Sequence, residues 1–366
     1  MTDIVLFGAT GYTGTLTAKA MVARGLAPVL AGRSRATLDS LARELGGLPV
    51  RVADVADPVS VRKLVKTGDV LVSTVGPFAR YGKPALDAAL AGKAHYLDST
   101  GEPAFVRQVF EQYNDRARKI NRVFLTAFGY DYVPGNTAAA AAVEKAGPDA
   151  VRVDVGYFVG DGETFNMSQG TFTSLAGAMS EPGIFFNGGA RQPAYGGLRT
   201  RRFDLNGKMI GAMSVPGSEC VALPVSYPQL RDVNVYLGWF GNFSPIVSGV
   251  AHAQRVLLGV PGYKRVVDWA TGKLGSKGKG PDEAERAAEG SHIIAIAYDA
   301  AGNELARADL RGVNGYTYTA NMLAWGAHQA SEGTMLGSGA LGPVAAFGLP
   351  ALVEGNQEAG LVLSVR

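Results

Sequence analysis

The stretch that decides the fold is DIVLFGATGYTG, residues 3–14. Residues 3–7 form a short apolar strand, and glycines at positions 8, 11 and 14 follow it before a helical pattern begins. Glycines at this spacing let the backbone turn tightly, approach a pyrophosphate and pack the next helix on the strand. The N-terminal amides and the dipole of that helix then face the anion. The pattern predicts a dinucleotide-binding turn, and the residues expected to contact the cofactor there are Gly8, Thr10, Gly11, Tyr12, Thr13 and Gly14.

Short apolar strands alternate with amphipathic helices from residue 3 to about residue 126. The expected strands are Ile4–Phe7, Pro28–Ala31, Val50–Ala53, Val70–Ser73, His95–Leu97 and Val123–Thr126. Strands that are joined by helical crossovers form a parallel, doubly wound sheet. We therefore expect an α/β protein whose residues 1–135 make a Rossmann domain.

The pattern changes after Gly147 to one that is typical of antiparallel strands. Asn206-Gly207, which is a strong hairpin signal, joins two strand patterns, and a second hairpin turns around Gly302-Asn303. Residues 148–314 are therefore expected to form an α+β domain with a largely antiparallel sheet, for substrate binding or dimerisation. Residues 315–366 are expected to be helical and to pack back on the first domain.

Composition excludes several classes of function. A net charge of +3 over 366 residues gives no electrostatic reason to expect a nucleic-acid partner. The single cysteine, Cys220, excludes a disulfide framework, and four scattered histidines lack metal-ligand spacing, so no metal site is expected. Neither a signal peptide nor a transmembrane segment is expected, which favours the cytoplasm and leaves peripheral membrane contact open.

The end of the second expected strand indicates the type of nucleotide. NAD-binding proteins place an acid here to bond the ribose 2′-hydroxyl, but this chain has Gly32-Arg33-Ser34 and no acid before Asp39. Arg33 and Ser34 can instead bind a 2′-phosphate, the arginine as a bidentate donor. The alternative is that Ser34 caps the following helix and Arg33 is a surface charge. NADP(H) is the expected cofactor.

Other candidate cofactor residues follow the later strands of the same sheet. Asp54 is placed to accept from the adenine amino group, although an aspartate that caps a loop has the same pattern. The fourth strand is followed by small residues and then by the rigid Gly76-Pro77 pair. The backbone there would lie beside the ribose and nicotinamide. The complete further set is Asp54, Val55, Thr74, Val75, Gly76, Pro77, Phe78, Thr100 and Gly101.

Candidate proton donors follow the fifth and sixth strands. Hydride reduction of a C=C or C=N bond also needs a proton, which a tyrosine or a partly desolvated carboxylic acid can supply. The candidates are Asp98, Tyr130, Asp131 and Tyr132. The structural alternative is that Asp131 caps a helix and Asp98 orders a loop.

The chain resembles the saccharopine dehydrogenase-like family, including the trans-acting enoyl reductases of actinobacterial lipid synthesis. The matching segments are Gly8 to Gly14, Gly32-Arg33, Thr74 to Gly82, Tyr96 to Glu102 and Gly129 to Pro134. The resemblance implies an NADP-linked reductase with the GYDYVP segment near the hydride-transfer face. One position departs from the family pattern of proline, small residue, acid, because this chain has Asn136 after Pro134-Gly135.

Three functions follow as hypotheses. The first is an NADPH-dependent reductase of an enoyl-type C=C bond in an apolar acyl, polyketide or lipid-like metabolite; the second is an imine or amino-acid oxidoreductase of the saccharopine type. The third is a non-catalytic NADP sensor. An apolar substrate is favoured because two aromatic-rich stretches, residues 153–190 and 232–254, contain no Lys or Arg to pair a substrate carboxylate. Whether a carrier presents the substrate, and whether the protein is a homodimer, stay open.

Overall fold

The computed structural model describes residues 2–160, 182–239, 244, 249 and 280–366. The chain divides into two compact units. The first comprises Met1–Thr100, Phe105–Val133 and Gly315–Gly360, and the second comprises Gly101–Ala104, Pro134–Asn314 and Leu361–Arg366.

The first unit is built on a seven-stranded sheet in which every pairing is parallel, in the order β15-β6-β5-β4-β1-β2-β3. Its strands are β1 Ile4–Phe7, β2 Val29–Gly32, β3 Val50–Val52, β4 Val70–Ser73, β5 His95–Asp98, β6 Val123–Leu125 and β15 Gly339–Ala340. All residues of β1, β2 and β4 are buried, as continuous apolar strands in the middle of a parallel sheet should be.

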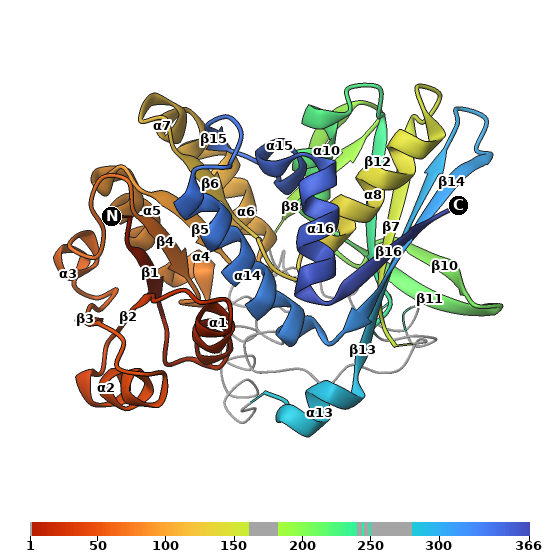
Figure 1. Ribbon diagram of the computed structural model, residues 1–366. Helices are drawn as coiled ribbons and strands as arrows, with labels where there is room; N and C mark the ends of the chain where they lie inside the picture. The colour runs from red at the N-terminus through yellow and green to blue at the C-terminus, as the bar shows by residue number, and fades with distance from the viewer. Residues whose placement is uncertain (1, 161–181, 240–243, 245–248, 250–279) are drawn as a thin grey trace. The chain divides into compact units, whose positions relative to one another are not determined.

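Helices connect these strands and cover both faces of the sheet (Figure 1). They are α1 Tyr12–Ala23, α2 Arg35–Glu44, α3 Pro58–Arg62, α4 Phe78–Tyr81, α5 Lys83–Gly92, α6 Pro103–Gln108, the π-helix η1 Val109–Tyr113, α7 Asn114–Lys119, α14 Gly315–Glu332, α15 Pro343–Phe347 and α16 Leu349–Ala359. The long helix α14 packs against α1, α16, β4 and β5. The doubly wound α/β architecture is therefore confirmed.

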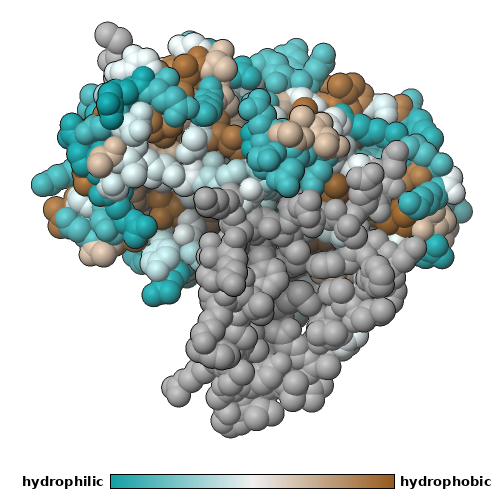
Figure 2. Space-filling view, turned by 90° about the horizontal axis from the view of Figure 1, so that it is seen from below, coloured by the Kyte–Doolittle hydropathy of each residue, from teal (hydrophilic) through white to brown (hydrophobic). Residues whose placement is uncertain are grey.

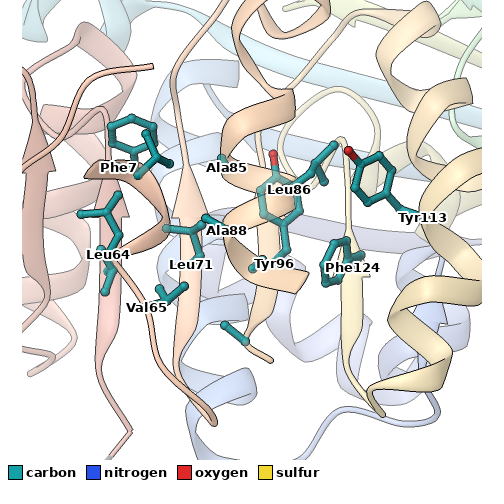
Figure 3. Packing of buried hydrophobic residues seen from close by; sticks show 14 of the residues in the cluster. Phe7, Leu64, Val65, Leu71, Ala85, Leu86, Ala88, Tyr96, Tyr113 and Phe124 are labelled. Atoms are coloured by element: carbon teal, nitrogen blue, oxygen red, sulfur yellow. The ribbon is translucent and has the colours of Figure 1, made fainter. Parts of the chain in front are cut away.

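One face of this sheet carries a large apolar core. Figure 3 shows the Tyr96 ring lying among Leu71, Leu86 and Phe124 in that core. The rings of Tyr96 and Phe124 have centroids 5.5 Å apart, and Tyr96 is fully buried. Tyr96 therefore belongs to the core of the first unit.

The second unit is built on a mixed sheet in the order β10-β11-β12-β7-β13-β14-β16, to which β8 and β9 are attached beside β12. The β12–β7 pairing is parallel and the others are antiparallel. The strands are β7 Arg152–Val159, β8 Gly183–Asn187, β9 Ala190–Ala194, β10 Thr200–Leu205, β11 Lys208–Val215, β12 Asp232–Leu237, β13 Gly290–Tyr298, β14 Glu304–Val313 and β16 Leu361–Val365; the described helices of eight or more residues that accompany them are α8 Val133–Ala146 and α10 Glu219–Ser226. A largely antiparallel second sheet is thus confirmed.

Local signals explain several of these elements. Asn206 and Gly207 have φ of +56° and +86° between β10 and β11, as a two-residue hairpin requires. Asp57 accepts a hydrogen bond from the Val59 amide at the start of α3. The short helix α13, Glu283–Ala288, begins with a capping box between Asp282 and Glu285.

The units differ from the expected domain ranges in two places. Apart from Gly101–Ala104, the second unit begins at Pro134 rather than at residue 148, because most of α8 is assigned to it. The last residues form β16, which pairs with β14 in the second sheet, whereas a helical end was expected.

Within the described ranges, no helix is long and apolar enough to span a membrane. The described atoms on the face shown in Figure 2 mix hydrophilic and hydrophobic side chains.

Candidate active site

The three glycines of the turn after β1 serve different purposes. Gly8 has a φ of +92°, and a Cβ there would lie 2.7 Å from the Thr74 hydroxyl oxygen. A Cβ on Gly14 would lie 2.1 Å from the Gly8 carbonyl oxygen, so α1 could not pack on the turn. Gly11 has an ordinary φ of −76°, and its Cβ would meet only that carbonyl oxygen, at 3.3 Å, among the described atoms within 4 Å. The space beside Gly11 therefore leaves the room that a pyrophosphate would need, and its role in binding stays a prediction.

The start of α1 suits an anion. The helix begins at Tyr12 and has no acidic residue in its first turn, so its positive end is not neutralised. Thr10 is exposed and Thr13 is half-buried beside the turn. The Tyr12 ring meets the Tyr316 ring of α14 edge-on, with centroids 5.2 Å apart. These features fit the phosphates of a dinucleotide.

The exposed residue Arg33 follows the end of β2. Arg33 is exposed and makes no hydrogen bond or ion pair with any residue that the structure describes. Ser34 is the N-cap of α2 and accepts from the Thr37 amide at 3.4 Å. The next arginine, Arg35, is held by Asp39 through contacts of 2.9 Å to both carboxylate oxygens. Ser34 thus does cap the helix and Arg33 is an exposed charge, as the structural alternative expected, and a role of Arg33 in binding a 2′-phosphate stays a prediction.

The ends of β3 and β4 place the next candidates. Asp54 Oδ1 accepts from the Ala56 amide at 2.9 Å, so the aspartate does order its own loop, and Val55 is half-buried. The Thr74 hydroxyl lies 3.2 Å from the Gly8 carbonyl oxygen and ties the β4 end to the phosphate turn. Val75 is half-buried, Gly76 and Pro77 are exposed, and Phe78 packs in the core against Phe105. A cofactor role for these residues stays a prediction.

Asp98 ends β5 and is fully buried. Its Oδ1 accepts from the amides of Thr100 and Ala127, both at 2.9 Å, and from the Thr126 hydroxyl at 3.2 Å. Burial raises the pKa of Asp98 to about 6, and the three donors oppose that rise. Gly101, expected beside Thr100 at the cofactor, is assigned to the second unit.

The GYDYVP segment follows β6. Tyr130 and Tyr132 are buried, and their amides donate to Thr319 Oγ1 at 3.0 Å and to the Ala127 carbonyl oxygen at 2.9 Å. Asp131 is partly accessible, but its Oδ1 is fully buried and has no hydrogen-bond partner among the described residues. Burial raises the pKa of Asp131 to about 7. Its carboxyl group can therefore carry a proton near neutral pH.

Helix α14 contributes residues that the sequence pattern did not reveal. A Cβ on Gly129 would lie 2.8 Å from Thr319 Cγ2, and one on Gly315 would lie 3.0 Å from the Tyr130 ring. Two small residues thus let α14 approach the GYDYVP segment closely. No motif in the sequence links residue 315 to residue 130, so only the fold could reveal this contact. Among the described residues, no group of three or more His, Cys, Asp or Glu is placed to hold a metal.

Comparisons with known proteins agree with this geometry. Residues 4–125 match the family described as the saccharopine dehydrogenase NADP-binding domain. A trans-acting enoyl reductase of Mycobacterium ulcerans is 33% identical over 153 residues, which are 40% of this chain and 37% of that protein. One of Mycobacterium tuberculosis is 34% identical over 140 residues, which are 37% of this chain and 34% of that protein. This chain thus spans little more than a third of the length of these curated relatives.

A solved structure extends the likeness in fold to the whole chain. The apo saccharopine dehydrogenase (L-Glu forming) of Saccharomyces cerevisiae superposes with a TM-score of 0.61, with 13% identity and with 100% of each chain covered. At this identity the likeness shows the fold alone. The predicted NADP(H) cofactor is confirmed by the matched domain. Residues 4–125 of this chain are thus similar to the NADP-binding domain of saccharopine dehydrogenases.

Proposed function

We propose that this protein is an NADPH-dependent reductase that reduces an enoyl-type C=C bond in an apolar acyl, polyketide or lipid-like metabolite. The observation that carries the proposal is Asp131, a carboxyl group with a raised pKa in the unit that holds the dinucleotide turn. The names of the mycobacterial relatives support the type of bond. Because those matches cover only part of each protein, the activity of the whole chain is a proposal.

The cofactor is expected to lie along the ends of the first strands. Gly11 and the first amides of α1 would hold the pyrophosphate, and Arg33 would pair with the 2′-phosphate. When bound, NADPH supplies the hydride, and reduction needs one proton in addition. Asp131 would supply that proton, since a pKa of about 7 leaves a large fraction of it protonated near neutral pH. Turnover should therefore fall as the pH rises through about 7.

The class of substrate is inferred from the aromatic, cation-free stretches and from the relatives' names. Phe158 and Tyr236 belong to the apolar core of the second unit, so part of the aromatic, cation-free sequence is ordinary core. Phe165, Phe172, Phe240 and Phe243 lie outside the described residues. The aromatic residues are also not remote from cations, because the guanidinium of Arg199 lies 5.7 Å from the Phe185 ring centre. The apolar substrate is favoured chiefly by the relatives' names.

Other expectations stay predictions. The single cysteine, Cys220, is buried and free, which suits a reducing cytoplasm. Presentation of the substrate on a carrier, peripheral membrane contact and a homodimer are each compatible with the fold.

The proposal is tested by following the loss of NADPH absorbance with three classes of substrate. These are medium-chain enoyl thioesters, cyclic imines, and 2-oxo acids mixed with amines. Oxidation of NADPH with the enoyl thioesters is the expected result. Oxidation with imines or amino-acid precursors alone would replace it by the saccharopine-type activity, and tight NADPH binding without consumption would favour a sensor.

Two variants test the proton donor in the same assay. Asp131→Asn should lower turnover by about 10² while NADPH affinity changes little. Tyr132→Phe removes only a hydroxyl and tests whether that phenol contributes, for which a similar loss is expected. Unchanged turnover in Asp131→Asn would exclude this carboxyl group as the proton source.

A further inference from the structure

One oxygen of Asp98 gathers donors from two loops. Oδ1 accepts from the Thr100 amide after β5, and from the Thr126 hydroxyl and the Ala127 amide after β6. The Asp98 carbonyl oxygen also accepts from the Phe128 amide at 2.7 Å. A single buried residue therefore joins the ends of the two strands that carry the candidate proton donors.

The residue on which these contacts converge has an unusual backbone. Ala127 has a φ of +57°, in the left-handed region that residues with a Cβ seldom adopt. Its amide is bound by Asp98 Oδ1, and its carbonyl oxygen accepts from the Tyr132 amide at 2.9 Å. Such a conformation persists only where the surroundings hold it, and it is frequent at functional sites. The turn that is closed by these two bonds contains Asp131.

Asp98 and Asp131 differ in their access to solvent. Asp98 has no exposed surface, and its Oδ2 is buried without a hydrogen-bond partner among the described residues. Its neighbour Tyr96 is part of the apolar core, and the Tyr96 hydroxyl is buried without a hydrogen-bond partner among the described residues. A proton donor must be reloaded from solvent in each cycle, and Asp131, which is partly accessible, meets that condition better.

We infer that Asp98 is a positioning residue, whose carboxylate fixes the left-handed turn at Ala127 and thereby the place of Asp131, and that Asp98 does not itself transfer the proton. This inference rests on the proposed function for the role of Asp131. Burial raises the pKa of Asp98 to about 6, which stays below the value of about 7 for Asp131, because the donors to Oδ1 favour the ionised form and oppose the effect of burial. Near pH 7 Asp98 is thus mostly ionised, and an enclosed carboxylate with three donors holds a turn well.

Hydrogen exchange tests the structural half of the inference without any substrate. Asp98→Ala should speed the exchange of the amides of Ala127 and Tyr132 by about tenfold or more, whereas Asp98→Asn keeps an oxygen acceptor and should change them little. Thr126→Val removes only the hydroxyl bond, and it serves as the milder variant if Asp98→Ala does not fold. Unchanged exchange at both amides in Thr126→Val and in any folded Asp98→Ala, or a rise spread evenly over the whole first unit, would overturn the inference.

Turnover tests the other half. Asp98→Asn should keep kcat within about threefold of the unmodified enzyme, with the same loss of activity as the pH rises, while Asp131→Asn loses about 10². A loss in Asp98→Asn as large as that in Asp131→Asn, together with a shifted pH profile, would make Asp98 the proton donor and overturn the inference. If the unmodified protein reduces no enoyl thioester, the proposed function fails, and the exchange measurements still decide whether Asp98 holds the turn.

Discussion

Asp131→Asn should stabilise the first unit at alkaline pH although it removes activity. The pKa of Asp131 is raised to about 7 in the fold, against an ordinary value of 3.8 for an aspartic acid. The folded protein therefore binds this proton more tightly than the unfolded chain does, so the contribution to stability is full below pH 3.8 and is lost as the pH rises towards 7. Asparagine stays neutral and should lack this loss.

The size of the effect follows from the shift. At about 1.4 kcal/mol for each pKa unit, the full penalty of the buried carboxylate is about 4 kcal/mol, and the partial access of the residue makes this an upper bound. Between about pH 5 and pH 8 the variant should gain up to about 3 kcal/mol over the unmodified protein. Asp98, whose pKa is raised to about 6, destabilises both proteins over part of the same range, and its contribution cancels in the comparison.

Urea unfolding of both proteins at these two pH values measures the difference, with a probe in the first unit so that its transition is followed separately. Asp39→Asn, which removes a carboxylate on the surface of the same unit, is the matched control and should show no comparable gain. An equal dependence on pH in the unmodified protein and in Asp131→Asn would show that Asp131 is ionised at ordinary carboxylate pH. The proton-donor argument would then fail with it.

Three further predictions concern single residues. Gly11→Ala should leave the melting temperature nearly unchanged and weaken NADPH binding at least tenfold. Gly14→Ala should instead lower the melting temperature of the first unit, because its Cβ would lie 2.1 Å from the Gly8 carbonyl oxygen. Equal effects of the two variants would contradict the expectation that the space beside Gly11 holds the pyrophosphate. NADPH should bind at least tenfold tighter than NADH, about 1.4 kcal/mol, and Arg33→Ala should remove most of that gap, while Arg35→Ala should not. Calorimetric titration with each nucleotide measures both changes. Ala127→Gly should raise stability by about 1 kcal/mol by relieving the left-handed conformation, and a loss in urea unfolding would show that the alanine is not strained.

Most of the fold could be predicted from hydrophobic periodicity and from residues that favour turns. Buried apolar strands such as Ile4–Phe7 and the Asn206-Gly207 hairpin are local signals, and the structure places them within a residue or two of the expected bounds. The strand β15, Gly339–Ala340, has no such signal because it is very short and owes its conformation to pairing with β6. The strand β16 likewise follows a helix, and only its pairing with β14 defines it.

The candidate site divides in the same way. The phosphate turn has a sequence pattern, yet the pattern does not say that Gly14 serves packing and Gly11 leaves room for a ligand. The left-handed backbone of Ala127 has no sequence signal, since alanine is not among the residues that favour that conformation. Asp98 and Asp131 both follow apolar strands in the sequence, and only burial and donor geometry distinguish them.

Asn136 stands where the resembling family has an acid, and its contacts explain why an amide suits this position. Within the second unit Asn136 is fully buried, and its amide nitrogen donates to Ser218 Oγ at 3.1 Å. A Cβ on the preceding Gly135 would lie 2.2 Å from a carboxylate oxygen of Glu219, so this part of the helix α8 already packs beside a buried acid. A second buried carboxylate one residue further along would need a cation, whereas a neutral amide does not. The asparagine therefore suits the packing of α8, and the missing acid does not bear on Asp131, the proton donor that we propose, which lies before the helix.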